Sequence, residues 1–273
     1  MCLPECHEVL AKRLGRRGFL GGAAAATVGA GFASNALAAP VPEDTSFSRV
    51  VDLTHALSPE FPTFGNGVNV EIEAVADYGS AGYNVNRWHL VEHTGTHMDA
   101  PLHFIKDGIP VDQIDPANLV VPLAVIDVRA QAARDPDYRL TPDDITVWEA
   151  KHGRLPDNCC VALNSGWSDY VAAEKFRNAD PEGTMHFPGF HSHTAALLIQ
   201  ERNVAGIAVD TLSLDFGGSK DFATHHAWLL SGRWGLECIA NLDQVPARGA
   251  TLVVGAPKIK GATGGPSRLF ALV

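Results

Sequence analysis

Short apolar segments rich in β-branched and aromatic residues recur along the chain and alternate with more polar segments of helical character, without any internal repeat. Apolar segments of this kind, bounded by Gly, Pro, Asn and Asp, are typical of β-strands. The pattern predicts eight strands, over residues 49–54, 68–76, 83–92, 122–128, 159–164, 205–210, 235–240 and 251–256.

Helices are fewer and have clearer start signals. Thr141 is a good N-cap, Pro142 suits the first helical position, and the acidic first turn predicts a helix that extends to about His152. Two further helices are expected over 192–202 and 222–230. Strands that alternate with helices in this way predict a single α/β domain.

The first 38 residues have the features of an export signal. The segment Arg16-Arg17-Gly18-Phe19-Leu20 fits the twin-arginine pattern, an Ala/Gly-rich stretch follows, and Ala36-Leu37-Ala38 is a small-x-small cleavage signal. We therefore predict a twin-arginine signal peptide over 1–38 and a mature domain over 39–273. A transmembrane anchor is the less favoured alternative, because the stretch lacks the ~20 strongly apolar residues of a span.

Export through the twin-arginine route places the mature protein in the periplasm or outside the cell. The route carries folded proteins, often with a cofactor already inserted. The signal peptide holds four basic and two acidic side chains, so its removal takes the net charge from −10 to −12. An acidic body argues against nucleic acid or an anionic membrane surface as a partner.

Three cysteines remain after cleavage, and their spacing does not predict a disulfide framework. Cys159 and Cys160 open an apolar segment, where small buried core residues are the favoured interpretation. Whether Cys238 is also a free thiol stays open at this stage.

The densest group of candidate metal ligands lies between His93 and His103, in the segment His-Thr-Gly-Thr-His-Met-Asp-Ala-Pro-Leu-His. Imidazole and carboxylate together suit Zn, Mn, Fe or Co, and a set of two His and one carboxylate leaves positions open for water and substrate. His93, His97 and Asp99 lie closest together and are the favoured ligands. His103 is either a further ligand or a free acid/base.

These four positions are all odd, so an extended strand would present them on one face. Ten steps of about 3.3 Å would nevertheless spread them over roughly 33 Å, which is too far for one ion. Gly95 and Pro101 allow the backbone to curl. We therefore expect a strand over about 87–92 that breaks into a tight turn carrying the ligands.

The C-terminal half holds candidates for the rest of the site in Thr224-His225-His226 and in Glu237. A charged Glu inside an apolar strand is costly unless it is paired or coordinated, which favours Glu237 as a functional carboxylate. The alternative is that Glu237 faces solvent on an edge strand. His191 and His193, near a helix start, are interpreted as structural residues or as residues that support the ligands from behind, not as ligands.

The segment from His93 to His103 matches every fixed position of H-x-G-T-H-x-D-x-P-x-H, and the chain thereby resembles the cyclase family of metal-dependent hydrolases, which includes bacterial kynurenine formamidases and isatin hydrolases. Further stretches resemble family landmarks in the family's order: Asp52-Leu53-Thr54, Asn164-Ser165-Gly166-Trp167, Phe187-Pro188-Gly189 and the segment from Gly206 to Asp215.

The resemblance implies an α/β fold of the swivelling β/β/α type with a mixed sheet, and a homodimer or larger assembly. It implies that His93, His97 and Asp99 bind metal and that His103 is the catalytic acid/base. A later His followed twelve residues on by Glu completes a second metal site in the family, which His225 and Glu237 match. Asp and Glu bridge the two ions there.

The kynurenine formamidases carry a Trp-Pro-Gly-Asp stretch in an N-terminal loop that shapes the pocket, where this chain has Phe61-Pro62-Thr63-Phe64-Gly65-Asn66-Gly67. Candidates to pack an aromatic substrate ring are Phe61, Phe64, Trp88 and Trp167, with core packing as the alternative for each. Asp210 and Asp215 follow an apolar strand and could either orient ligand imidazoles or cap backbone N–H groups.

The predicted activity is metal-dependent hydrolysis of an amide C–N bond in a small aromatic substrate. The bound ion, Zn or Mn and one or two in number, would polarise the carbonyl and activate water, with His103 moving the proton. An arylformamidase that releases kynurenine and formate from N-formylkynurenine and a hydrolase of isatin-like cyclic amides share this site. A non-catalytic periplasmic metal-binding protein is the alternative from another class.

Overall fold

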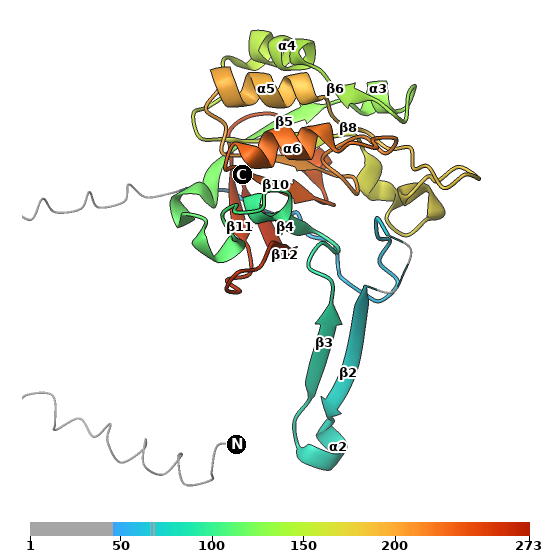
Figure 1. Ribbon diagram of the computed structural model, residues 1–273. Coiled ribbons are helices and arrows are strands. Elements are labelled where there is room, and N and C mark those ends of the chain that lie inside the picture. Colours follow the sequence, from blue (N-terminus) through green and yellow to red (C-terminus); the bar gives the residue numbers. More distant parts are fainter. Residues whose placement is uncertain (1–45, 66, 68) are drawn as a thin grey trace, which may run out of the picture. The chain divides into compact units, whose positions relative to one another are not determined.

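Nine strands form one mixed sheet at the centre of the computed structural model, which describes residues 46–65, 67 and 69–273 (Figure 1). Across the sheet the strands lie in the order β1 (Val50–Asp52), β13 (Arg268–Leu272), β11 (Ala250–Gly255), β5 (Val120–Asp127), β7 (Cys160–Asn164), β9 (Gly206–Val209), β10 (Trp234–Glu237), β4 (His97–Asp99) and β12 (Gly264–Pro266). Strands β5, β7, β9 and β10 are parallel, and the other pairings are antiparallel. The predicted signal peptide lies outside the described residues.

The central strands are buried on both faces, which explains their continuous apolar sequences. In β7, Cys160 and Ala162 belong to one core cluster while Val161 and Leu163 belong to another on the opposite face. Three helices, α4 (Pro142–His152), α5 (Ser192–Glu201) and α6 (Ala223–Leu230), lie along that second face (Figure 1). The fold is thus a single α/β domain with a mixed sheet, as predicted.

Shorter elements connect this framework. The strands β6 (Arg139–Leu140) and β8 (Gly189–Phe190) form a small parallel pair, and α3 (Arg129–Ala132) is a single turn of helix. The 3₁₀ turns are η1 (Pro101–His103), η2 (Val111–Gln113), η3 (Pro116–Asn118), η4 (Trp167–Tyr170), η5 (Glu174–Phe176) and η6 (Leu242–Gln244). Within the described part of the chain, no helix is long and apolar enough to cross a membrane.

A two-stranded ribbon extends away from the main sheet (Figure 1). It consists of β2 (Val70–Ala76) and β3 (Val85–Leu90), which are joined through the short helix α2 (Tyr78–Ala81). Ile72 lies opposite Trp88 on one side of the ribbon, and Glu73 pairs with Arg87 at 2.8 Å on the other. Every residue of β3 is exposed, so the ribbon presents apolar side chains to its surroundings.

Each of the eight predicted strands corresponds to an observed one, with ends that differ by at most three residues. The prediction missed β4, β6, β8, β12 and β13, most of which have only two or three residues. A strand such as Gly264–Pro266 has no β-propensity of its own and exists because its neighbour β4 pairs with it.

Among the described residues, Cys159, Cys160 and Cys238 are free and buried, which for Cys159 and Cys160 agrees with the favoured interpretation as small core residues. Cys159 and Cys160 face opposite core clusters, and Cys238 packs in a third cluster beside Phe187. Burial raises the pKa of all three thiols, which favours the protonated form at neutral pH.

Helix α4 begins with a capping box. The Thr141 side chain accepts from the Asp144 N–H at 3.4 Å, and the Asp144 carboxylate accepts from the Thr141 N–H at 2.8 Å. Thr141→Ala should therefore lower the free energy of unfolding by about 1 kcal/mol. Urea unfolding would measure this loss, and Thr146→Ala, farther along the same helix, is the control expected to change stability less.

Candidate metal centre

The short strand β4 carries two of the predicted ligands. His97 and Asp99 lie on one face of β4, while Met98 between them points into the core and is fully buried. Strand β10 pairs with β4 so that Glu237 lies directly opposite His97. Glu237 is 5% exposed, which excludes the alternative that it faces solvent on an edge strand.

The turn before β4 contains Gly95, whose φ of +70° favours glycine. A Cβ at this position would also lie 2.8 Å from Leu57. The expected turn is therefore present, but His97 and Asp99 follow it on a paired strand rather than lying within it. His103 comes from the 3₁₀ turn η1, which starts at Pro101 directly after the strand.

Helix α6 brings His225 to the same point. Asp215 accepts from the backbone N–H groups of Thr224 and His225 at 2.8 and 3.1 Å, and from His225 Nδ1 at 2.6 Å. Asp215 thus both caps the helix and orients the imidazole, the two roles that the sequence left open. Asp210 instead accepts from Ser165 and from the Trp167 N–H, so it orders a neighbouring turn.

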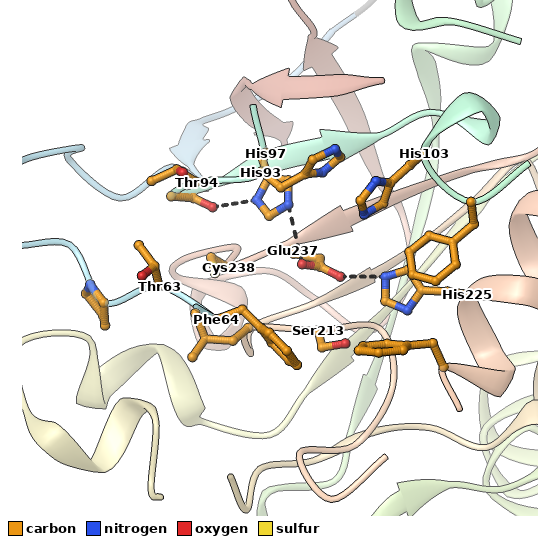
Figure 2. Close-up of a pocket in the computed structure, with 15 residues that line it drawn as sticks. Thr63, Phe64, His93, Thr94, His97, His103, Ser213, His225, Glu237 and Cys238 are labelled. Carbon is orange, nitrogen blue, oxygen red and sulfur yellow. Dashed lines mark hydrogen bonds and ion pairs between the residues drawn. The ribbon is translucent and has the colours of Figure 1, made fainter. Parts of the chain in front are cut away.

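Among the candidate ligands His93, His97 and His225, the last two are held in place by a hydrogen bond at Nδ1. His97 Nδ1 bonds the Gly95 carbonyl at 2.8 Å, and His225 Nδ1 bonds Asp215. Their Nε2 atoms face the two carboxylates. His97 Nε2 lies 3.4 Å from Asp99. In Figure 2 the Nε2 atoms of His97 and His225 both point to Glu237, at 3.4 and 3.1 Å. Fixing one nitrogen of a ligand imidazole determines which nitrogen is left for a metal ion.

His93 is arranged the other way round. Its Nδ1 lies 2.7 Å from Asp99 Oδ1, whereas its Nε2 bonds the Thr263 hydroxyl at 2.9 Å. His103 stacks on the His93 ring with centroids 3.6 Å apart and 19° between the planes. Burial lowers the pKa of His103 to about 4, so this imidazole is neutral at pH 7.

The donor set fits a divalent cation. His97 Nε2 and Asp99 Oδ2 are buried and have no hydrogen-bond partner among the described residues. Leaving such atoms unsatisfied in a protein interior is costly, and a cation between them would satisfy both. Asp99 belongs to two sets of side chains that are close enough together to hold one ion. One set is His93, Asp99 and His103, and the other is His97, Asp99 and Glu237.

The charges around Asp99 support the same conclusion. Burial opposes ionisation of Asp99, yet the neighbouring imidazoles of His225, His93 and His97 hold its pKa well below the usual range. Glu237 is likewise buried, and the same two imidazoles that face it, His225 and His97, lower its pKa. Two buried carboxylates surrounded by three imidazoles form a donor set of the kind that binds Zn, Mn or related ions.

The ligands face a cavity of about 270 Å³. Its floor includes His93, His97, His103, His225 and Glu237 (Figure 2). The remaining walls come from three loop segments, 62–64, 94–95 and 212–213, and from Phe104, Phe222 and Cys238. A metal-ligand cluster that opens into a partly apolar pocket is typical of an enzyme site for a small organic molecule.

Of the four aromatic residues predicted to contact substrate, only Phe64 lines this cavity. Phe61, Trp88 and Trp167 do not line this cavity, and a contact of these residues with substrate stays a prediction. Phe61 packs on Phe176 in a separate core cluster, and the Trp167 indole donates to the Phe176 carbonyl at 2.9 Å. Trp88 is 69% exposed on the ribbon.

The sequence analysis missed Phe104 and Phe222. The Phe222 ring lies 5.8 Å from Phe64 and 5.7 Å from Phe104, so the three form an aromatic wall. Phe222 has a φ of 48°, as Cys238 has a φ of 53°, and bulky residues rarely adopt this conformation. Such backbone strain gathers at functional sites, but no sequence pattern in one chain marks it.

His191 and His193 lie outside the cavity, as predicted. His191 is the N-cap of α5, and its Nδ1 accepts from the His193 N–H at 3.1 Å. His193 is exposed. Both residues therefore have structural positions at the start of α5.

Comparison with known proteins agrees with this geometry. A model of the cyclase family, described as "Putative cyclase", matches residues 51–216. An isatin hydrolase of Roseibium aggregatum is 35% identical over 244 residues, which cover 82% of this chain and 92% of that protein. The solved structure of isatin hydrolase A from Ralstonia solanacearum is 40% identical, covers 82% of this chain and 92% of its own, and superposes with a TM-score of 0.78. A kynurenine formamidase of Bacillus cytotoxicus is 28% identical over 81% of this chain and 96% of its own.

The chain belongs to the cyclase family. Together, the family and the site define the class of protein: a metal-dependent hydrolase that acts on amide C–N bonds.

Proposed function

We propose that this protein hydrolyses the ring amide of a small bicyclic aromatic lactam of the isatin type. The observation that carries this proposal is the buried cluster of three imidazoles and two carboxylates at the floor of a cavity with an aromatic wall. Identity to isatin hydrolases at 35–40%, against 28% to the kynurenine formamidase of Bacillus cytotoxicus, favours the cyclic amide over a linear formamide.

We assign the metal to His93 Nδ1, His97 Nε2 and Asp99, with His225 Nε2 and Glu237 as the complement for a second ion. Support comes from the orientation of each nitrogen toward the carboxylates and from the unpartnered atoms His97 Nε2 and Asp99 Oδ2. Zn or Mn suits this mixed nitrogen and oxygen donor set. Asp99 belongs to both ligand groups, so the site accommodates one or two ions.

When bound, the ion supplies Lewis-acid polarisation of the substrate carbonyl and lowers the pKa of a water molecule. His103 is the group that moves the proton. Its neutral imidazole lines the cavity beside His93 and can accept the proton of the water that adds to the carbonyl carbon. His103 then delivers that proton to the ring nitrogen as the C–N bond breaks, which yields an aryl amine and a carboxylic acid that releases its own proton to solvent.

The aromatic wall sets a further expectation. If Phe64 packs against the substrate ring, Phe64→Ala should raise KM about two- to tenfold and change kcat less, since a ring contact contributes about 0.5–1.5 kcal/mol. Steady-state kinetics on isatin measure both constants. Phe47→Ala, which removes an exposed aromatic side chain outside both the cavity and the ribbon, is the matched control, and an equal effect of the two substitutions would contradict this placement.

The substrate itself is tested with two amides. Hydrolysis of isatin at a kcat/KM well above that for N-formylkynurenine supports the proposal, and the reverse order would make the protein an arylformamidase. No hydrolysis of either compound by metal-loaded protein would favour the third candidate, a metal-binding protein without catalytic activity.

We further propose that the protein is exported by the twin-arginine route and works in the periplasm or outside the cell as a homodimer or larger assembly. The arginine pair at Arg16-Arg17 supports export, and the exposed apolar side of the β2–β3 ribbon supports assembly. Arg16→Lys with Arg17→Lys should retain the protein in the cytoplasm, as cell fractionation would show.

A further inference from the structure

A hydrogen-bonded chain lies behind His93, on the side away from the carboxylates. His93 Nε2 is 2.9 Å from the Thr263 hydroxyl, and that hydroxyl is 2.5 Å from Glu92 Oε2. The Thr263 backbone N–H also points to the same Glu92 oxygen at 3.3 Å. Glu92 and Thr263 are 171 residues apart in sequence, so this arrangement exists only in the folded protein.

The chemistry of the three groups sets the direction of these bonds. An ionised Glu92 can only accept, so the single hydroxyl proton of Thr263 goes to Glu92. The Thr263 oxygen then has only lone pairs to offer His93, and Nε2 must be the donor. His93 therefore carries its proton on Nε2, which leaves Nδ1 as the nitrogen that faces Asp99 at 2.7 Å.

The backbone holds Thr263 in a fixed place relative to the ligands. Its carbonyl accepts from the Ala100 N–H at 2.9 Å, directly after β4, and the next residue, Gly264, pairs with Asp99 across β12 and β4. A Cβ on Gly264 would lie 2.7 Å from His93 Cε1. The His93 ring is thus confined between Gly264 on one side and the stacked His103 ring.

This arrangement differs from that of the other two imidazoles. His97 and His225 are tied back through Nδ1, to a carbonyl and to a carboxylate, and present Nε2. His93 comes from the turn that precedes β4, and its ring reaches the site from another direction. For His93 to present Nδ1 to a metal ion, its Nε2 needs a hydrogen-bond partner. The Thr263 hydroxyl, which itself bonds Glu92, is that partner.

We propose that Glu92 and Thr263 are a positioning pair that selects Nδ1 of His93 as the metal-binding nitrogen. The inference rests on the proposed function, because it assumes that His93 is a ligand. Partners of this kind contribute about 10- to 100-fold in metal affinity.

The test compares matched variants for Zn²⁺ affinity, measured by competition with a chromophoric chelator. Thr263→Val keeps the shape and loses the hydroxyl, so we expect about 10- to 100-fold weaker binding. Thr263→Ser keeps the hydroxyl and should bind like the wild type. Glu92→Leu should weaken binding, whereas Glu92→Gln, which can still accept from Thr263, should weaken it less.

A second readout reports the tautomer directly. Long-range ¹H–¹⁵N spectra of the Zn²⁺-loaded protein should show His93 protonated on Nε2, with His97 and His225 protonated on Nδ1. Equal Zn²⁺ affinity of Thr263→Val and wild type, or a His93 proton on Nδ1, would overturn the positioning pair while leaving the proposed function intact. A wild-type protein that binds no metal would overturn both. Melting temperatures of the metal-free variants show whether each is folded.

Discussion

His97→Ala is expected to abolish metal binding and hydrolysis together. His97 Nε2 lies 3.4 Å from both Asp99 and Glu237, at the centre of the cluster, and is itself without a hydrogen-bond partner among the described residues. Without His97 the site lacks one candidate ligand, and the two buried carboxylates lose a neighbouring imidazole. Metal affinity should fall by more than the ~100-fold that loss of a mere supporting group can cause. Elemental analysis and isatin hydrolysis on one preparation measure both effects.

The control for this substitution is His193→Ala. His193 lies at the start of α5, is exposed, and does not line the cavity, so its loss should leave metal content and activity unchanged. Circular dichroism of the metal-free proteins separates a lost ligand from a lost fold. A His97→Ala protein that keeps its metal and full activity would show that the ion, if any, lies elsewhere.

His103→Asn is expected to separate catalysis from metal binding. His103 lines the cavity and stacks on His93. It is not among the imidazoles that bond the two carboxylates, which are those of His93, His97 and His225. As the proton carrier it should contribute about 10²- to 10⁴-fold to kcat/KM. The variant should therefore lose that much activity and retain its metal.

The opposite pattern is equally informative, since His103 also lies within ligand distance of His93 and Asp99. Loss of stoichiometric metal in His103→Asn would make this residue a ligand and would require another group to move the proton. Phe104→Leu, which changes the adjacent ring that contacts both His103 and His225, is the control for altered packing.

The clustering of the candidate metal ligands could be predicted from sequence because local spacing carries most of their geometry. His97 and Asp99 are two residues apart, so any extended backbone places them on one face, and the Gly95 turn brings His93 back toward them. The contribution of Glu237 depends on the β4–β10 register, which pairs residues 140 positions apart. The cost of a charge in an apolar strand and the twelve-residue spacing from His225, which matches the family, indicated it.

The substrate-facing aromatic residues were predicted less well, because aromatic side chains serve cores, exposed ribbons and pockets alike. Trp88 lies in a correctly predicted strand, yet that strand belongs to a ribbon remote from the cavity rather than to the main sheet. Phe222 reaches the pocket through a left-handed backbone conformation just before α6, which tertiary packing imposes. Thr263 and Glu92 meet only through the β12–β4 pairing.

The most direct test of the account is the metal dependence of the reaction. The protein is stripped with a chelator, shown by its melting curve to be folded, and titrated with Zn²⁺ or Mn²⁺ while isatin hydrolysis is followed. The account predicts no activity without metal, and activity that rises with bound metal and saturates at one or two ions per chain. Full hydrolysis by the stripped protein would contradict it.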